Sequence, residues 1–529
     1  MAGRLAVDFG TSNTRVAVWD EALDEAGTVA VPDVSVTARY EDSERRTIEV
    51  PYVPSLVAYE GTRMWIGKQV ADKGLLESGT TFRWMKRYIS NRLEIPRKVD
   101  GRAVKISEAG SDFLTRVLVY AAEFIDLGDE EVAFTVPVEA FEHYQDWLIG
   151  VCEAAGIPRY RLIDEASAAA LGYGVKLKAG DTYMVFDFGG GTLDVSIVRM
   201  ESTSVGGRRC TVLGKGGAEI GGATIDKWLY RDFLEKNGKA PEDIRHVSGL
   251  LLLEVERAKE TLTASDRADI VVADPDTGEV FSAHYSRSAF EDLLEENGLF
   301  ETVHAVMNRA LSDAGERGYE GDRIAEVLLV GGSSLIPSVR RAVRQVFGRR
   351  VSSHRPLDAV VLGAAAFVHG VDFYDHVQHE YALRYYDRET GEHDYLRIVP
   401  SGTPYPTDGP ILDVMVSASY DDQEFLGLDI YEIGRKECFS CGEGPQLDLV
   451  FDPSGAARFQ ERQEPEVMSR FWMNEKCPTF IEARPKARRG DKRFPVQFSV
   501  DGNKRLCVTV RDKRSGKVLF DRHPLVKLT

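Results

Sequence analysis

Two short stretches of the chain combine an aspartate, glycines and hydroxyl side chains directly after an apolar strand. They are Asp8-Phe-Gly-Thr-Ser12 and Asp187-Phe-Gly-Gly-Gly-Thr192. Glycine lets the backbone approach a phosphate closely, and successive N–H groups in a tight turn form a concave site for an anion. Mg2+ in proteins is held by a few carboxylates together with phosphates of the ligand. The two stretches therefore predict a pair of loops around a magnesium-bound phosphate group.

Each stretch belongs to a longer repeat. Residues 5–18 and residues 184–198 both read as an apolar strand, a tight glycine turn and a second strand. A single Asp-Gly pair indicates no more than a hairpin turn, but two matched copies, each after an apolar strand, disfavour that interpretation. The repeat predicts two similar lobes that face each other across a cleft, with Asp8 and Asp187 on opposite sides.

The segments around the repeats predict α/β lobes. Residues 131–137 and 327–330 have the apolar pattern of buried strands. Residues 161–165 lead into a small-residue helix at 166–171, and residues 359–368 are expected to form a closing helix. Residues 288–291, Ser-Ala-Phe-Glu, match a capping box at the start of a further helix.

The pattern of apolar and polar residues changes after residue 370. Short alternating segments separated by turn residues replace the helical periods, and residues 496–510 read as a hairpin turning through Asp501-Gly-Asn503. We predict a domain at 1–370, a linker at 371–385 and an antiparallel β-sandwich at 386–529 that no helical region follows.

Composition and charge narrow the class of protein. The net charge of −18 disfavours nucleic acid as a partner, and the run at residues 484–493 is interpreted as a solvated basic loop. No apolar run has the length of a membrane span and the N-terminus lacks a signal-peptide pattern, so a cytoplasmic protein is expected. Cys438 and Cys441 have the spacing of a metal pair, but no second pair follows, and reduced thiols are favoured over a zinc or redox site.

In five motifs, in the same order, the first 370 residues resemble the 70-kilodalton heat-shock (DnaK) chaperone family of the actin-like ATPase superfamily. Besides the two aspartate loops, the motifs are Asp164-Glu-Ala-Ser-Ala-Ala-Ala-Leu-Gly-Tyr-Gly174, Glu254-Val-Glu-Arg-Ala-Lys-Glu-Thr-Leu262 and Val330-Gly-Gly-Ser333. The resemblance implies an actin-like two-lobed ATPase domain with a duplicated ribonuclease H-like α/β fold. It also implies ATP or ADP and Mg2+ as cofactors. The C-terminal part resembles the family's β domain more weakly, and the family's helical lid is expected to be absent.

The resemblance implies roles for individual residues. Asp8 and Asp187 would hold hydrated magnesium, and Lys86 would stabilise the γ-phosphate and the attacking water. Glu165 would bind the water shell of the metal, and Asp194 would orient the nucleophilic water. The implied nucleotide contacts are Gly10, Thr11, Ser12, Gly189, Gly190, Gly191 and Thr192 at the phosphates, Glu256 and Lys259 at the ribose, and Gly331, Gly332, Ser333 and Asp358 at the nucleoside end.

Two of these residues have simpler interpretations. Lys86 lies among other cations and could be an ordinary surface lysine, and Glu165 could cap the alanine-rich helix that follows it. The chain also departs from the family where arginines flank the adenine, because Glu260 and Leu335 stand there, and Asp146 stands at the relay arginine position. The family's acidic-leucine linker is missing, which puts the coupling between the domains in doubt.

Two functions remain open from the sequence. The first is an ATP-hydrolysing chaperone that binds protein or peptide clients through the β domain, with J-domain and nucleotide-exchange proteins as further partners. The second is a nucleotide-gated scaffold or regulator with one dedicated protein partner. A small-molecule kinase is disfavoured, because no sugar-recognition motif is present and the β domain would have no role. No nucleic acid and no membrane are expected as partners.

Overall fold

The computed structural model describes residues 4–528 except 42–45, 95, 124, 126–130, 138–141, 158, 174–177, 179, 203–207, 317–318, 320–323, 370–371, 375–376, 378, 387–390, 408, 434–446, 452–456, 462–469, 475–477 and 502–504. The chain forms two compact units. The first comprises Met1–Val138, Asp146–Phe373 and Phe439–Arg462, and the second comprises Glu139–Gln145, Tyr374–Cys438 and Gln463–Thr529. The predicted domain boundaries stay predictions.

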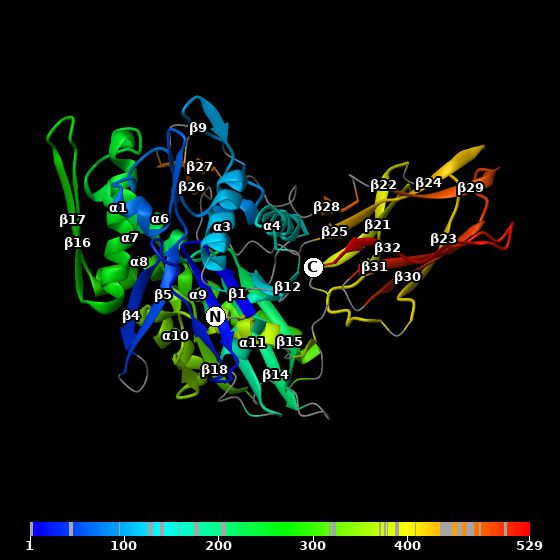
Figure 1. Ribbon diagram of the computed structural model, residues 1–529, viewed down its shortest axis with the longest axis horizontal. Helices are drawn as coiled ribbons and strands as arrows, with labels where there is room; N and C mark the ends of the chain where they lie inside the picture. Colours follow the sequence, from blue (N-terminus) through cyan, green and yellow to red (C-terminus); the bar gives the residue numbers. More distant parts are fainter. Residues whose placement is uncertain are drawn as a thin grey trace. The chain divides into compact units, whose positions relative to one another are not determined.

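The first unit contains two sheets built on the same plan (Figure 1). In each sheet three parallel strands are followed by an antiparallel hairpin partner, in the orders β12-β11-β1-β2 and β19-β18-β13-β14. Strands β1 and β13 are almost wholly buried, as expected of parallel strands covered on both faces. The bounds are β1 Arg4–Phe9, β2 Asn13–Asp20, β11 Val132–Val136, β12 Tyr160–Asp164, β13 Thr182–Phe188, β14 Leu193–Ser202, β18 Ile324–Val330 and β19 Val351–Ser352. The predicted duplication and α/β class are confirmed.

Further strands extend these sheets, and helices cover them. Strands β3, β4 and β5 extend the first sheet and β15 and β20 extend the second, while β16 and β17 form a separate hairpin. Their bounds are β3 Glu25–Thr28, β4 Val36–Glu41, β5 Thr47–Pro54, β15 Arg208–Ala218, β16 Arg267–Ala273, β17 Val280–Ser286 and β20 Asp372–Tyr374. The longer helices are α3 Ile106–Ala122, α4 Glu142–Ala154, α6 Gly222–Lys236, α7 Ser248–Ala264, α8 Arg287–Glu296, α9 Leu299–Glu316 and α10 Pro337–Phe347.

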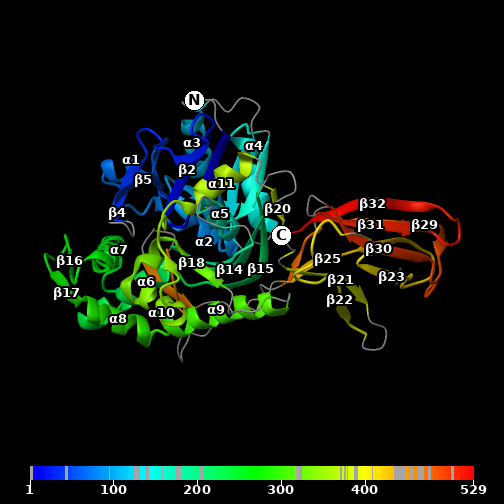
Figure 2. The same ribbon diagram turned by 90° about the horizontal axis from the view of Figure 1, so that it is seen from below.

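Helices α5 (Glu165–Gly172) and α11 (Ala359–His369) pack closely against each other in the first unit (Figure 2). A Cβ atom on Gly172 would lie 1.8 Å from the Ala359 carbonyl oxygen, and one on Gly363 would lie 1.6 Å from that of Ala168. Their core includes buried residues of both sheets, such as Ala6 and Val185. The glycines therefore allow one close helix pair to join the cores of the two lobes.

The predicted capping box at residues 288–291 is wrong by two residues. The N-cap of α8 is Ser286, whose hydroxyl accepts a hydrogen bond from the Ala289 amide at 3.1 Å. Strand β17 ends at this serine, so the chain enters the helix directly from the hairpin and Ser288 already lies inside it. Helix α8 ends at Glu296, and Gly298, at φ +71°, separates it from α9.

The second unit consists mainly of antiparallel strands. Beyond His369, the described residues contain strands and turns but no helix. Its sheets have the orders β22-β21-β25-β28, β23-β30-β31-β32 and β24-β29. The bounds are β21 Glu380–Tyr386, β22 His393–Val399, β23 Leu412–Val416, β24 Gln423–Leu428, β25 Ile430–Ile433, β28 Arg470–Trp472, β29 Thr479–Ala487, β30 Phe494–Val500, β31 Arg505–Arg511 and β32 Val518–Lys527. Their inward-facing apolar residues form one buried core, consistent with the predicted β-sandwich.

Two sequence predictions in this part have clear outcomes. The predicted hairpin is confirmed, because β30 pairs with β31 in antiparallel register up to Val500 and Leu506. Part of the predicted linker forms strand β21. The cysteine pair Cys438 and Cys441 lies outside the described residues.

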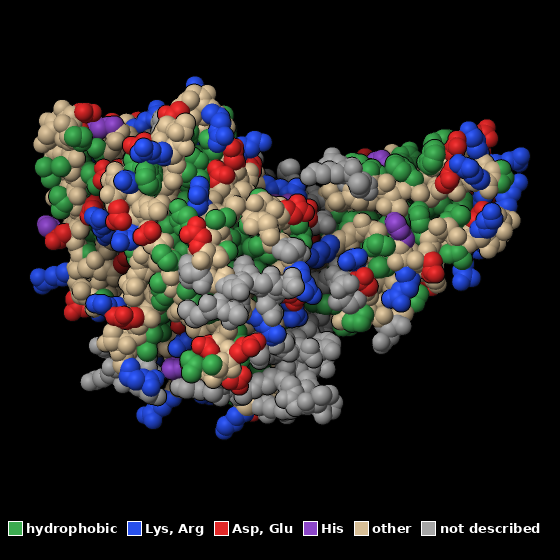
Figure 3. Space-filling view, viewed as in Figure 1, with side chains coloured by type: hydrophobic (Ala, Val, Ile, Leu, Met, Phe, Trp, Pro, Cys, Tyr) green, Lys and Arg blue, Asp and Glu red, His purple; other side chains and the backbone are tan. Residues whose placement is uncertain are grey.

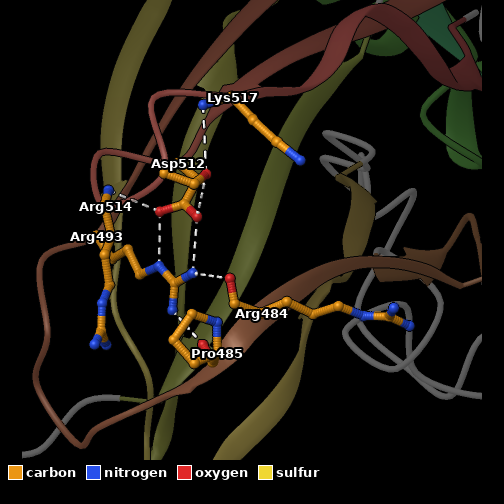
Figure 4. A network of polar contacts seen from close by, with 7 residues as sticks. Arg484, Pro485, Arg493, Asp512, Arg514 and Lys517 are labelled. Carbon is orange, nitrogen blue, oxygen red and sulfur yellow. Dashed lines mark hydrogen bonds and ion pairs between the residues drawn. The ribbon is translucent and has the colours of Figure 1, made fainter.

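One member of the basic run at residues 484–493 is not solvated. Arg493 is buried and donates from Nε and one terminal nitrogen to the two carboxylate oxygens of Asp512, both at 2.7 Å (Figure 4). Its terminal nitrogens also donate to the carbonyl oxygens of Arg484 and Pro485. The guanidinium thus ties the end of β29, the start of β30 and the turn after β31 together, while Arg484, Arg488 and Arg489 are exposed as expected.

Charged side chains of both signs are interspersed over the face of the molecule in Figure 3. Within the described part of the chain, no helix combines the length and the apolar character that crossing a bilayer demands.

Candidate active site

The two aspartate loops lie against each other in the first unit. A Cβ atom on Gly190 would come 2.8 Å from Ser12 Oγ, and one on Gly191 would come 2.6 Å from Thr11 Oγ1. The Gly189 amide donates to the Thr192 carbonyl at 3.0 Å, which closes the tight turn between β13 and β14. Glycine at both positions lets the two turns come this close, and the hydroxyls of the first loop therefore meet the backbone of the second.

Four carboxylates gather beside these loops. Asp8, Glu165, Asp187 and Asp194 are each between 4% and 8% exposed. Asp187 and Asp194 are cross-strand partners on β13 and β14, and Asp8 accepts a hydrogen bond from the Thr135 hydroxyl at 2.8 Å. Burial raises the pKa of Asp187, and the negative charges of Glu165, Asp194 and Asp8 raise it further. A site with this much uncompensated negative charge suits a cation.

Lys86 supplies a positive charge to the cluster. It lies in α2 (Met85–Ser90), is 7% exposed, and its Nζ donates to Glu165 Oε1 in a close ion pair. Burial raises the pKa of Glu165, and the charge of Lys86 counteracts that rise. Lys86 is therefore not a surface cation.

Glu165 does not cap the helix that it begins. The N-cap of α5 is Asp164, which accepts a hydrogen bond from the Ser167 amide at 2.9 Å. The Glu165 side chain is thus left to pair with Lys86 at the carboxylate cluster. Glu165 pairs with Lys86 beside three further buried carboxylates, and carboxylate oxygens are the ligands that Mg2+ prefers. The residues present therefore fit a hydrated magnesium ion.

The segment after β18 adjoins the second loop. Ser333 Oγ donates to the Gly189 carbonyl at 2.8 Å. Gly331 has φ +82°, and a Cβ atom there would lie 2.7 Å from Asp187 Oδ1. Gly332 begins the short helix η3 (Gly332–Leu335), in which Leu335 is half-buried. The structure thus brings the predicted nucleoside segment and the predicted metal ligand Asp187 together.

The predicted ribose residues of α7 have protein partners. Lys259 Nζ binds the Asp226 carboxylate at 2.8 Å and the Gly222 carbonyl at 3.2 Å. Burial raises the pKa of Asp226 to about 7, against the opposing charge of Lys259. Burial disfavours the charged form of Lys259, but neighbouring carboxylates, Asp226 first among them, outweigh it and raise its pKa. Lys259 is held in place beside Gly222, close to Ser333.

Glu256 faces an arginine that the sequence did not single out. Arg83 Nη1 lies 3.5 Å from Glu256 Oε2, and the Arg83 side chain is almost wholly buried. Arg83 precedes α2, so the pair links the segment that carries Lys86 to helix α7. Asp226 and Arg83 were both missed because their partners are far away in the chain. Only their nearness to predicted site residues in space identifies them.

The remaining predicted site residues, and the positions at which the chain departs from the family pattern, lie as follows. Asp358 is buried, with Oδ2 3.4 Å from Arg355 Nη1, and burial raises its pKa. Glu260 is exposed on α7 and Asp146 is exposed on α4. Gly10 belongs to the first loop, where a Cβ atom would lie 2.2 Å from the Asn13 carbonyl oxygen.

The comparisons with known proteins agree with one another on the family. Residues 98–373 match the sequence model described as Hsp70 protein. The chain is similar to the chaperone protein DnaK of Deinococcus proteolyticus, with 25% identity over 98% of this chain and 78% of the relative. It is 27% identical to DnaK of Thermus thermophilus, over 98% of this chain and 80% of the relative. A chaperone protein HscA homolog of Pseudoalteromonas atlantica is 29% identical over 59% of this chain and 52% of the relative.

Proposed function

The chain belongs to the Hsp70 family, and we propose that it is a molecular chaperone that binds and slowly hydrolyses ATP. The observation that carries the proposal is the buried cluster of Asp8, Glu165, Asp187 and Asp194 with Lys86, next to two glycine turns that lie against each other. The family supports ATP and Mg2+ as the ligands.

In this proposal the phosphates lie against the two loops. The backbone of residues 189–191 and the hydroxyls of Thr11, Ser12 and Thr192 donate to them, since hydroxyls and backbone amides at a tight turn favour anions. Asp8 and Asp187 hold magnesium through water. The ion supplies positive charge that offsets the charge of the phosphates.

Three side chains act around the reacting phosphate. Lys86 stabilises negative charge on the γ-phosphate, and its buried ion pair with Glu165 fixes its position. Asp194 lies opposite Asp187 on the hairpin and orients the attacking water. The phosphoryl chemistry itself needs mainly such positioning and charge compensation.

Steady-state ATP hydrolysis by the wild type and by Lys86→Ala tests the active site. We expect the substitution to lower kcat by about 100-fold or more, the usual effect of removing one preorganised charge-stabilising donor. Arg39→Ala is the control, since Arg39 is an exposed cation of the same unit that pairs with exposed Glu49. Equal rates for wild type and Lys86→Ala, or no hydrolysis by the wild type, refute the ATPase proposal.

The chaperone part of the proposal concerns the second unit. We propose that it binds protein or peptide clients, with J-domain and nucleotide-exchange proteins as partners of the ATPase cycle. Fluorescence anisotropy of a panel of unrelated unfolded peptides, measured with ADP and with ATP, tests it. Binding of several peptides, weakened by ATP, is expected. Binding of none of them by an active ATPase favours the alternative of a nucleotide-gated scaffold for one dedicated partner, which the altered linker also supports.

A further inference from the structure

Arg15 of β2 lies in a row of side chains that extends from the predicted metal site. Asp8 on β1 pairs with Arg15, and Thr14 pairs with Val53 on β5, so Tyr52 is the next partner in line with Arg15. The guanidinium carbon of Arg15 lies 6.0 Å from the centre of the Tyr52 ring. Directly opposite residues of neighbouring strands point to the same face of a sheet. Asp8, Arg15 and Tyr52 therefore share one face.

The row of side chains is about as long as a nucleotide. Neighbouring strands lie about 4.8 Å apart, so Tyr52 on the third strand is about 10 Å from Asp8. Burial raises the pKa of the Tyr52 hydroxyl, the negative charge of Glu260 on α7 raises it further, and the positive charge of Arg15 lowers it. Glu260 directly follows Lys259, a predicted ribose contact. The far end of the row thus lies at the predicted nucleoside end of the site.

Two polar atoms at this end lack a hydrogen-bond partner among the described residues. They are Arg15 Nε, a donor, and Asp358 Oδ1, an acceptor, and both atoms are buried. Burial raises the pKa of the Asp358 carboxyl, and the positive charges of Arg355 and Arg15 oppose that rise. Buried polar atoms without partners are rare in folded proteins and call for a specific explanation. A ligand group that both donates and accepts hydrogen bonds, as the edge of adenine does, would satisfy both atoms.

We infer that Arg15 and Tyr52 form the platform for the adenine base. The inference rests on the proposed nucleotide site and goes beyond it, because neither residue belongs to the motifs that carry the family resemblance. An aromatic ring such as that of Tyr52 stacks well on a base, while the guanidinium of Arg15 can donate from Nε to the edge of the base. Arg15 restores a positive charge at the end of the site where Glu260 and Leu335 stand in place of arginines. Asp358 then completes the contact from the other sheet.

Isothermal titration with ADP and with pyrophosphate, both in Mg2+, tests the inference. Arg15→Met is expected to weaken ADP binding by about 10- to 100-fold, the usual cost of losing a hydrogen bond from a charged group. Pyrophosphate, which lacks the base, is expected to bind within about twofold of the wild type. Arg15→Lys keeps the charge but removes Nε and the planar face, so it is expected to lose ADP affinity as well. Arg39→Ala is the matched control, and thermal unfolding of each variant checks its fold.

Three outcomes overturn the inference. If Arg15→Met binds ADP as tightly as the wild type, Arg15 does not contact the nucleoside. If ADP and pyrophosphate weaken equally, Arg15 is a phosphate ligand and the base assignment is wrong. If the wild type binds neither ligand, the proposed nucleotide site itself fails, and the inference fails with it. Loss of ADP affinity in Tyr52→Ala, with pyrophosphate binding retained, is the independent result that the platform requires.

Discussion

Replacing Asp512 by asparagine removes the counter-charge of a buried arginine in the second unit. Arg493 and Asp512 are each only 2% exposed. After Asp512→Asn the guanidinium keeps its two backbone carbonyl acceptors but faces an amide in place of two carboxylate oxygens. Breaking a buried ion pair by removing one partner costs about 3–5 kcal/mol. Because the carbonyl contacts remain, we expect the lower end, about 3 kcal/mol, which is more than 100-fold in the opening equilibrium.

Hydrogen exchange of the full chain measures this loss locally. Amides of β30 and β31 that exchange through opening of the second unit are expected to exchange about 100-fold faster in Asp512→Asn. Amides of β13 and β14 in the first unit, and exposed Asp521→Asn as a matched variant, are expected to show no change. In the Arg493→Met/Asp512→Leu double variant both charges are gone, and exchange is expected to return towards the wild-type rate.

The pH dependence gives a second check on the same pair. Hydrogen bonds from Arg493 above all, with others from Ser515 and the Arg514 amide, lower the pKa of Asp512. A carboxyl with a lowered pKa stabilises the fold above its unfolded pKa of about 3.9 and loses that contribution as the pH falls. The difference between wild type and Asp512→Asn should therefore be constant from pH 7 to about 5 and shrink below pH 4. Equal exchange rates at pH 7, or a double variant less stable than Asp512→Asn, would refute the reasoning.

Two further predictions concern glycines. Gly191→Ala places a Cβ atom 2.6 Å from Thr11 Oγ1, so ADP affinity measured by titration is expected to fall about tenfold. The control Gly27→Ala, whose Cβ atom would have no atom within 4 Å, is expected to leave the ADP affinity unchanged. Equal ADP affinities of the two variants would contradict the contact between the loops. Gly363→Ala forces α5 and α11 apart and is expected to lower the free energy of unfolding by about 1–3 kcal/mol. Gly150 is exposed in the middle of α4, and because alanine favours a helix over glycine, Gly150→Ala is expected to raise the free energy of unfolding by about 0.5–1 kcal/mol. Urea denaturation measures both, and a change of the same sign in the two variants would contradict the close helix pair.

The sequence was sufficient for the features that depend on neighbours in the chain. The strands at Asp8 and Asp187 are almost wholly buried runs that end in glycine turns, and β30 alternates strictly between buried and half-buried residues. Such patterns predict the structure well because they depend directly on which face of a strand is buried. The resemblance to the family also predicted residues that the structure places together, including Lys86 and Glu165.

The features that depend on distant partners could not be predicted. Asp226 is an ordinary acidic residue of an amphipathic helix until Lys259, 33 residues away, faces it. Arg493 belongs to a run of cations, and nothing in the run shows that this member alone is buried with Asp512. The misplaced cap of α8 has a local cause: two serines lie near the helix start, and the end of β17 decides which one becomes the N-cap.

The central claim is that Asp8 and Asp187, on the paired hairpins, bind a magnesium–nucleotide complex. Titration of ADP into the wild type and into the Asp8→Asn/Asp187→Asn double variant, each with Mg2+ and with EDTA, tests it most directly. Mg2+ is expected to tighten ADP binding by at least about tenfold in the wild type, and the double variant is expected to lose this dependence, because the ion's water shell then has no charged partners at the loops. ADP affinity that is the same with Mg2+ and with EDTA in the wild type would rule out magnesium binding by these aspartates.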